Sequence, residues 1–158
     1  MDSDKKVILI TGSSSGIGAE LALIAAENAY NVVVSYNSNR AGADAVAEQC
    51  RKRGADVIVV AADVADDRSC RDLVAAAEQQ WGRLDSLVNN AGVTTFCPHD
   101  DLDGLEAEDF QRIYATNTVG AFLMARAAAP LLKASHGTIV NVASIAGVAS
   151  PEVNSFNS

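Results

Sequence analysis

The feature that most constrains the fold is an apolar run that ends in a glycine-rich turn, in the sequence VILITGSSSGIG of residues 7–18. Val7–Ile10 are consecutive apolar residues, which is typical of a parallel strand buried on both faces. Gly12 permits a tight turn after that strand, Gly16 leaves the backbone open to a phosphate group, and Gly18 lets a following helix pack close to the strand. The segment therefore predicts a strand, a turn and a helix whose N-terminus binds an anion.

The turn carries serine hydroxyls that add hydrogen-bond donors for such an anion. Its glycines follow G-x-x-x-G-x-G rather than the commoner G-x-G-x-x-G of dinucleotide sites. The residues that we expect to contact the ligand here are Gly12, Ser13, Ser14, Ser15, Gly16, Ile17 and Gly18.

Apolar runs alternate with helical patterns along the rest of the chain. We expect strands at about residues 6–11, 31–35, 57–61, 84–89 and 137–143. A helical segment lies between each pair of strands, and the last runs from residue 106 to about residue 134. This alternation predicts an α/β fold, a doubly wound parallel sheet of the Rossmann-like type with strand order 3-2-1-4-5. Its ligand would lie at the switch point beside the first and fourth strands.

The helical segments have recognisable faces and ends. In the first helix Ile17, Leu21, Ile24 and Ala25 recur at helical spacing on one face. We expect Ser38 or Asn39 to cap the second helix, Asp66 or Asp67 to cap the third, and Gly82 to end the third.

The composition excludes several classes of protein. A hydrophobic fraction of 49% with 20% charged residues fits a single globular domain over residues 1–158. The net charge of −8, without a basic cluster, argues against nucleic acid as a partner. Three widely spaced cysteines predict neither a disulfide framework nor a metal site. Because the start MDSDKK is polar and no apolar run reaches the length of a membrane span, we expect a cytoplasmic protein without a membrane partner.

Two further polar positions follow predicted strands, where ligands of such sheets bind. Asn89-Asn90-Ala91-Gly92 comes directly after the fourth strand, and on its own it is equally well explained as a turn. Its place beside the glycine turn favours ligand contacts from Asn89, Ala91 and Gly92. Ser144 follows the fifth strand, with a turn or cap residue as the alternative.

Asn117 lies inside the long helical region, in the sequence YATNTVGAF. Asparagine is a poor residue for a helix interior because its side chain competes for backbone hydrogen bonds. Its apolar neighbours indicate burial with a defined partner, and a solvent-facing position or a kink is the alternative.

Thr11 with the glycine turn, the NNAG sequence, Asn117 and Ser144 resemble, in this order, motifs of the short-chain dehydrogenase/reductase family. The resemblance covers essentially the whole chain. It implies an NAD(P)-dependent oxidoreductase in which Asn117 kinks its helix and holds a water of a proton relay. It also implies that Ser144 is the catalytic serine that hydrogen-bonds the substrate carbonyl.

The same resemblance implies roles on the adenosine side of the cofactor. Asn89 and Gly92 would shape that wall of the site. Asp63, followed by Val64 in AADV, stands where the family has an acidic residue that contacts the adenine amino group. An ordinary strand-end or cap residue is the alternative interpretation of Asp63.

The sequence departs from the family after Ser144. The family places a Tyr-x-x-x-Lys motif about a dozen residues further on, and the Lys lowers the pKa of the proton-transferring Tyr. The Tyr position falls on Phe156 or Asn157, and the last Lys of this sequence is Lys133. We therefore expect a truncated domain that is inactive as a 158-residue chain, with residues 144–158 as a mobile tail. The fifth strand would be an exposed edge, so we expect the chain to self-associate.

The end of the second strand bears on the choice of cofactor. NAD-selective sites place an acidic residue there, whereas the run SYNSNR has no carboxylate. We expect Tyr36, Asn37 and Arg40 to line the ribose. Arg40 could pair with a 2′-phosphate, or could equally be a solvated helix residue. NADP is the predicted cofactor. NAD is kept as the alternative, because many NADP-preferring relatives carry a basic residue at the position of Ser15 and this sequence does not.

Three functions stay open at this point. The first is an NADP-dependent oxidoreductase that transfers hydride between a nicotinamide and a small alcohol or carbonyl substrate, as a homo-oligomer in a full-length form. The second is a non-catalytic dinucleotide-binding or interaction module. The third is a methyltransferase on a similar sheet, which would leave NNAG and Asn117 without a role.

Overall fold

The structure is a computed structural model that describes residues 5–98 and 100–145. Its centre is a parallel sheet with the strand order β3-β2-β1-β4-β5, as the sequence predicts. The strands are β1 (Val7–Ile10), β2 (Asn31–Tyr36), β3 (Val57–Ala61), β4 (Ser86–Asn89) and β5 (Thr138–Asn141). Strands β2 and β3 are thus added on one side of β1, and β4 and β5 on the other. The point between β1 and β4 where this order reverses is where such folds bind ligands.

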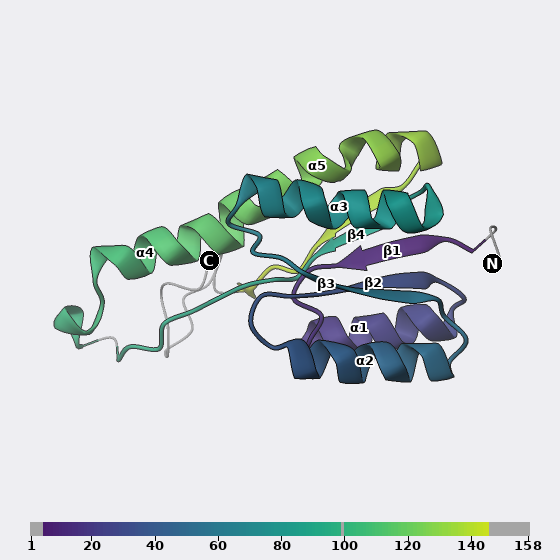
Figure 1. The fold of residues 1–158 in the computed structure, drawn as a ribbon. Helices are drawn as coiled ribbons and strands as arrows, with labels where there is room; N and C mark the ends of the chain where they lie inside the picture. Colours follow the sequence, from purple (N-terminus) through teal and green to yellow (C-terminus); the bar gives the residue numbers. More distant parts are fainter. Residues whose placement is uncertain (1–4, 99, 146–158) are drawn as a thin grey trace.

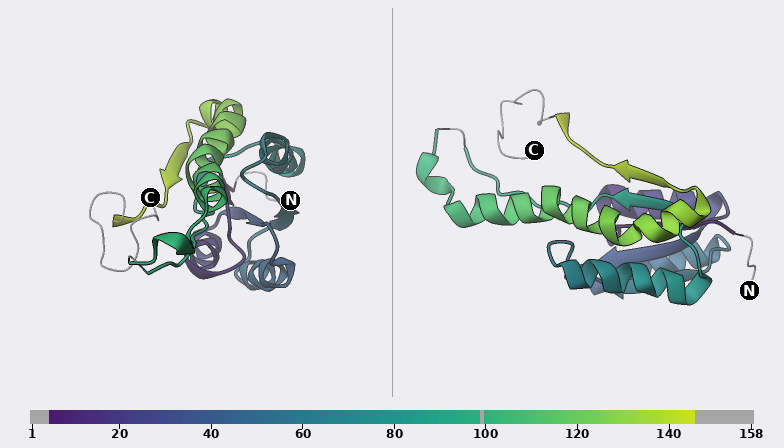
Figure 2. Two further views of the ribbon diagram at one scale, coloured as in Figure 1. Left: turned by 90° about the vertical axis from the view of Figure 1, so that its left-hand side faces the viewer. Right: turned by 90° about the horizontal axis from the view of Figure 1, so that it is seen from above.

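Helices cover both faces of the sheet (Figure 1). One face carries α1 (Gly16–Glu27) and α2 (Arg40–Lys52), and the other carries α3 (Asp67–Trp81) and α5 (Gly120–Ser135). A short 3₁₀ turn, η1 (Leu102–Gly104), leads to α4 (Ala107–Tyr114). The π-helical segment η2 (Ala115–Val119) joins α4 to α5, and α4 projects past the carboxyl ends of the strands (Figure 2).

Alternating side chains of the central strands form two cores. Val7, Leu9 and Val33 pack with α3 and α5, whereas Ile10, Val32 and Val34 pack with α1 and α2. All six side chains are inaccessible to solvent. A continuous apolar run is therefore needed in β1 and β2, since both faces of each strand are covered.

The predicted apolar face of α1 is confirmed for Ala25, which is buried, and for Leu21, which packs against the core, but it is wrong for the two isoleucines. Ile17 and Ile24 are 63% and 52% exposed, and the helix buries Gly18, Ala22 and Ala26 together with Ala25. The cause is Gly18, where an added Cβ would stand 2.5 Å from Asn90 Nδ2 and 2.7 Å from the Gly12 carbonyl oxygen. This close approach turns Gly18 inward, and the positions at helical spacing from it are alanines.

The predicted helix ends are confirmed. Asn39 caps α2 by accepting a hydrogen bond from the Gly42 N–H at 3.0 Å, and Asp66 caps α3 through the Ser69 N–H at 2.7 Å. Gly82 ends α3 in the left-handed conformation, with φ +67°. The long predicted helix is interrupted at η2, within which Asn117 lies.

Strand β5 forms the edge of the sheet next to β4, as expected. Its other side pairs with no strand within the described residues, and Ile139 and Val140 are 44% and 51% exposed. Of the predicted mobile tail, Ser144 and Ile145 are described, and the remainder, with Phe156 and Asn157, lies outside the described residues. None of the helices in the described part of the chain combines the length and apolar character of a membrane span.

Candidate functional site

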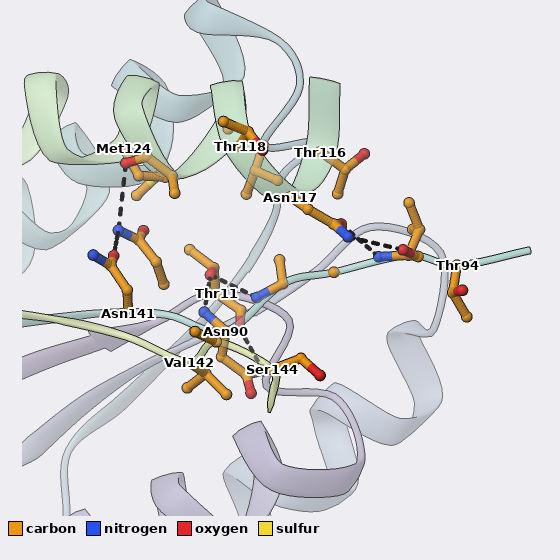
Figure 3. Close-up of a pocket in the computed structure, with 18 residues that line it drawn as sticks. Thr11, Asn90, Thr94, Thr116, Asn117, Thr118, Met124, Asn141, Val142 and Ser144 are labelled. Carbon is orange, nitrogen blue, oxygen red and sulfur yellow. Dashed lines mark hydrogen bonds between the residues drawn. The ribbon is translucent and has the colours of Figure 1, made fainter. Parts of the chain in front are cut away.

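A pocket of about 650 Å³ opens at the carboxyl ends of β1, β4 and β5. Its walls come from the segment after β4, from η2 and the start of α5, and from the segment after β5 (Figure 3). The pocket brings together several of the predicted site residues: Val64, Asn89, Ala91, Gly92, Asn117 and Ser144. The two predicted catalytic residues enter it from different elements, Asn117 from η2 and Ser144 from the chain beyond β5.

Thr11 holds the glycine turn against the NNAG segment. Its hydroxyl oxygen accepts hydrogen bonds from the Asn90 N–H at 2.9 Å and the Ala91 N–H at 3.0 Å, and its hydroxyl donates to the Val88 carbonyl at 3.3 Å. In return, the Asn90 side-chain amide donates to the Thr11 and Gly12 carbonyls at 2.9 and 3.2 Å. The two motifs therefore form one rigid surface, although they are far apart in the sequence.

The glycine turn leaves open space for a ligand where the sequence predicts it. Gly16 has φ +56°, and a Cβ added there would meet nothing within 4 Å. Ser15, the N-cap residue of α1, makes no side-chain cap hydrogen bond to the first turn. The first turn of α1 can therefore donate its N–H groups to an anion, as a phosphate-binding helix N-terminus requires.

The three serines of the turn do not lie alike. Ser13 is fully buried, and its hydroxyl donates to the Ile10 carbonyl at 2.8 Å, so this hydroxyl points into the fold. Ser14 is half-buried and Ser15 is exposed, and these two remain at the surface of the turn with the exposed Ile17. The Ser13 hydroxyl, because it is already bonded to the Ile10 carbonyl, supports the shape of the turn and offers no donor to a ligand.

Asn117 clamps the pocket wall. Its Oδ1 accepts a hydrogen bond from the Val93 N–H at 2.9 Å, and its Nδ2 donates to the Val93 carbonyl at 3.0 Å. Asn117 lies within the π-helical segment, and such bulges are frequent at functional sites. The side chain is half-buried with a defined partner, as its apolar neighbours indicate.

Asn89 faces α5 and β5. Its Nδ2 donates to the Asn141 Oδ1 at 2.8 Å and to the Ala121 carbonyl at 3.3 Å. Its Oδ1 is buried and has no hydrogen-bond partner among the described residues. Asn89 thus ties the strand ends that form the floor of the pocket.

The residues predicted to line the ribose, and Asp63, predicted to contact the adenine, are not among those that line this pocket, whereas Asn89 and Gly92 of the predicted adenosine-side wall are. Arg40 opens α2 with a side chain 74% exposed, and its Nε lies 3.5 Å from the Asp44 carboxylate. Tyr36 ends β2 and is half-buried, and Asn37 follows it and is exposed. The exposed Asp63 accepts the Ala65 N–H at 2.9 Å, so the structure also gives Asp63 a turn role.

One cluster beyond the pocket wall has no signal in the sequence. Thr95, beyond the NNAG segment, donates to the Asp109 carboxylate of α4 at 2.7 Å, and Arg112 contacts both residues. The hydrogen bond from Thr95, with those from the Glu106 N–H and Arg112, holds the pKa of the Asp109 carboxyl below its ordinary value. The cluster anchors the loop after β4 to α4, and it could be found only once α4 was placed beside that loop.

Comparison with known proteins gives the family. The sequence model described as short chain dehydrogenase matches residues 6–157. The chain belongs to the short-chain dehydrogenase/reductase family. A structure from Burkholderia xenovorans described as a short-chain dehydrogenase/reductase superposes with a TM-score of 0.92 at 37% identity, over 98% of this chain and 65% of that chain.

Its relatives in the short-chain dehydrogenase/reductase family are named as oxidoreductases. An uncharacterised oxidoreductase of Methylorubrum extorquens is 43% identical over 140 residues, which are 89% of this chain and 55% of the relative. The 3-oxoacyl-[acyl-carrier-protein] reductase of Staphylococcus aureus is 36% identical over 143 residues, which are 90% of this chain and 57% of the relative. The chain thus spans about half the length of the curated relatives that it matches.

Proposed function

We propose that this chain forms the dinucleotide-binding part of an NADP-preferring oxidoreductase that acts on a small alcohol or carbonyl compound. The observation that carries the proposal is the rigid surface made by the glycine turn and NNAG, beside the open Gly16 and the uncapped start of α1. A pyrophosphate fits there because its charge meets free N–H groups and no side chain stands in the way. The reductase names of the relatives support the reaction class.

The residues of the pocket would serve the reaction from two sides. A bound nicotinamide supplies or accepts the hydride. Ser144 enters the pocket where its hydroxyl can hydrogen-bond a substrate oxygen. Because Val93 occupies Asn117 Oδ1 and one Nδ2 hydrogen, Asn117 would reach a relay water through its backbone carbonyl or its second Nδ2 hydrogen.

The preference for NADP is proposed on Arg40 and on the absence of an acidic residue in the run from Ser35 to Arg40. Arg40 begins α2 next to the end of β2, and its partner Asp44 lies on the same exposed surface. A 2′-phosphate with two negative charges would compete well with a single exposed carboxylate for this guanidinium. NAD remains the alternative cofactor.

The test is the affinity of the 158-residue chain for NADPH and NADH, measured by the fluorescence of the bound dinucleotide. We expect tighter binding of NADPH, and we expect Arg40→Ala to weaken NADPH about fivefold while NADH changes little. Arg68→Ala is the matched control, since Arg68 also pairs with an aspartate four residues on and lies on α3. Tighter NADH binding would refute the NADP preference, and no binding of either would refute the function.

The 158-residue chain itself is proposed to bind without turnover, because no Tyr or Lys follows Ser144 in its sequence. Incubation with NADPH and a 3-oxoacyl thioester tests this by the loss of NADPH absorbance. Steady turnover would show that other residues supply the proton.

A further inference from the structure

Two buried serine hydroxyls join the glycine turn to the end of β2. Ser13 and Ser35 are 0% and 1% exposed. The Ser13 hydroxyl donates to the Ile10 carbonyl at 2.8 Å and accepts the Ser35 N–H at 2.9 Å. The Ser35 hydroxyl accepts the Gly12 N–H at 3.2 Å and donates to the Ile10 carbonyl at 3.3 Å, and the Ser13 N–H donates to the Ser35 carbonyl at 2.9 Å.

These bonds continue the pairing of β1 and β2 beyond the end of the regular ladder. The regular register of the two strands stops at Ile10 opposite Val34. After Ile10 the chain turns away through Gly12, which has φ +64°. Side-chain hydroxyls then satisfy the N–H of Gly12, the N–H of Ser35 and the carbonyl of Ile10, groups that would otherwise be buried without partners.

We propose that Ser13 and Ser35 are positioning residues for dinucleotide binding, which set the glycine turn at a fixed place relative to the end of β2. The inference rests on the proposed function. Both hydroxyls are occupied within the protein, so neither is offered as a ligand contact. The turn would face the pyrophosphate, and Tyr36 and Asn37, which follow Ser35 directly, would face the ribose. One pair of side chains therefore fixes the spacing of two parts of one ligand site.

Loss of the Ser35 hydroxyl would move the turn as well as weaken the fold. The Gly12 N–H would lose its acceptor, and the turn would have to shift to find a new one. Hydrogen bonds to a pyrophosphate depend on the position of the first turn of α1, which begins four residues after Gly12. Affinity for the dinucleotide should therefore fall by more than the lost stability explains.

Ser135 provides a matched control. Its hydroxyl is partly buried and, like those of Ser13 and Ser35, donates to backbone carbonyls, here those of Leu84 at 2.6 Å and Leu132 at 3.2 Å. It ends α5 just before β5, and so lies at the amino ends of the strands, opposite the site. Ser135→Ala removes the same chemical group without touching the turn.

The experiment measures the dissociation constant of NADPH for the 158-residue chain and for Ser35→Ala, Ser35→Thr and Ser135→Ala, at concentrations where circular dichroism shows each to be folded. We expect Ser35→Ala to bind about tenfold more weakly, and the other two to stay within about twofold of the unchanged chain. Ser35→Thr keeps the hydroxyl, and threonine is favoured in strands, so this variant should bind NADPH like the unchanged chain.

Two results would overturn the inference: Ser35→Ala binding within about twofold of the unchanged chain, or Ser135→Ala weakening NADPH as much as Ser35→Ala. If Ser35→Ala does not fold, Ser35→Thr is compared with Ser35→Val, which has the same shape and lacks the hydroxyl. Weaker binding by the Val variant supports the inference, and equal binding overturns it. If the unchanged chain binds neither NADPH nor NADH, the proposed function fails and the inference with it, which is distinguishable from failure of the inference alone.

Discussion

At the scale of single residues, the site depends on side chains that hold backbone. Asn117 does so by pairing both its amide atoms with Val93, on the wall of the pocket. The pairing is reciprocal, as between two strands, and it links η2 to a segment that has no regular structure of its own. An asparagine in a helical region is thus explained by a tertiary contact that its helix propensity opposes.

Asn117→Ala should remove this clamp. We expect a loss of about 2 kcal/mol in the free energy of unfolding, because the Val93 N–H and carbonyl lose their partners. Urea unfolding measures the loss of stability. In the variant, the Val93 amide hydrogen should exchange with solvent faster than those of its neighbours. Thr118→Ala, at an exposed position in the same π-helical segment, is the control and should change stability little. Equal losses in the two variants would contradict the clamp.

A second residue-scale prediction separates backbone strain from ligand space. Gly16 and Gly54 both have positive φ, +56° and +84°, and a Cβ at either would meet nothing within 4 Å. Alanine at either should therefore cost a similar amount of stability, about 1 kcal/mol. Under the proposed function Gly16→Ala should also weaken NADPH at least about tenfold, since its methyl group would enter the phosphate space, and Gly54→Ala should leave affinity unchanged. Calorimetry and a binding titration on both variants decide this.

At the scale of elements, one buried carboxylate ties the amino ends of three strands. Asp85 directly precedes β4 and is 6% exposed. Its carboxylate accepts hydrogen bonds from the Val7 N–H at 2.8 Å and from the Arg83 guanidinium at 2.7 and 2.9 Å. Its backbone N–H donates to the carbonyl of Val7 in β1, and its backbone carbonyl accepts the N–H of Thr138 in β5, at 2.9 Å each. Burial raises the pKa of Asp85, but the hydrogen bonds from Arg83 and Val7 outweigh it, and the pKa lies below its ordinary value.

Asp85 should therefore make folding sensitive to acid. Because its pKa is lower in the folded chain than in the unfolded chain, its stabilisation is present above the ordinary carboxyl pKa of about 4 and is lost as the pH falls through the folded value. We expect Asp85→Asn to cost about 2 kcal/mol at neutral pH, with a difference that shrinks below about pH 4. Denaturant unfolding of both proteins from neutral pH to pH 3 measures this difference in the free energy of unfolding. Asp72→Asn is the control and should change stability little, because Asp72 forms an exposed pair with Arg68. If the loss of stability caused by Asp85→Asn is the same at every pH, the proposed role of the Asp85 carboxylate is refuted.

At the scale of the whole molecule, the described sheet ends in two edge strands, β3 and β5, and of these two it is β5 that has exposed large apolar side chains in and beside it. Val140 and Val142 are 51% and 40% exposed, in and beside an edge strand that bears no charged residue. Unprotected apolar edges pair with other chains. Self-association of the 158-residue chain is therefore still our prediction.

Val140→Lys should reduce that association, because a charge on the edge opposes strand pairing. Sedimentation at several concentrations would show a mass that rises with concentration for the unchanged chain and stays near 16.4 kDa for the variant. Ile24→Lys, at an exposed apolar position on α1, is the control and should associate like the unchanged chain. Dissociation by both substitutions, or a monomeric unchanged chain, would contradict an association through β5.

The sequence by itself determined the kind and order of the elements, the strand order, the caps of α2 and α3 to within one residue, and the place of the glycine turn beside NNAG. These depend on local periodicity, on cap residues and on the handedness of crossovers, all of which act over a few residues or over a whole fold class. They also carried the family resemblance that the comparisons confirm.

Only the tertiary structure decided which face of α1 is buried, where the Ser13 hydroxyl points, and what Asn117, Asp85 and Thr95 bind. Each depends on a partner brought close by folding, such as Val93 for Asn117 or Asn90 for Gly18. A hydrogen bond requires its two atoms within about 3 Å at a suitable angle. The sequence supplies the donors and acceptors, but that distance and angle exist only after the sheet and its helices have packed.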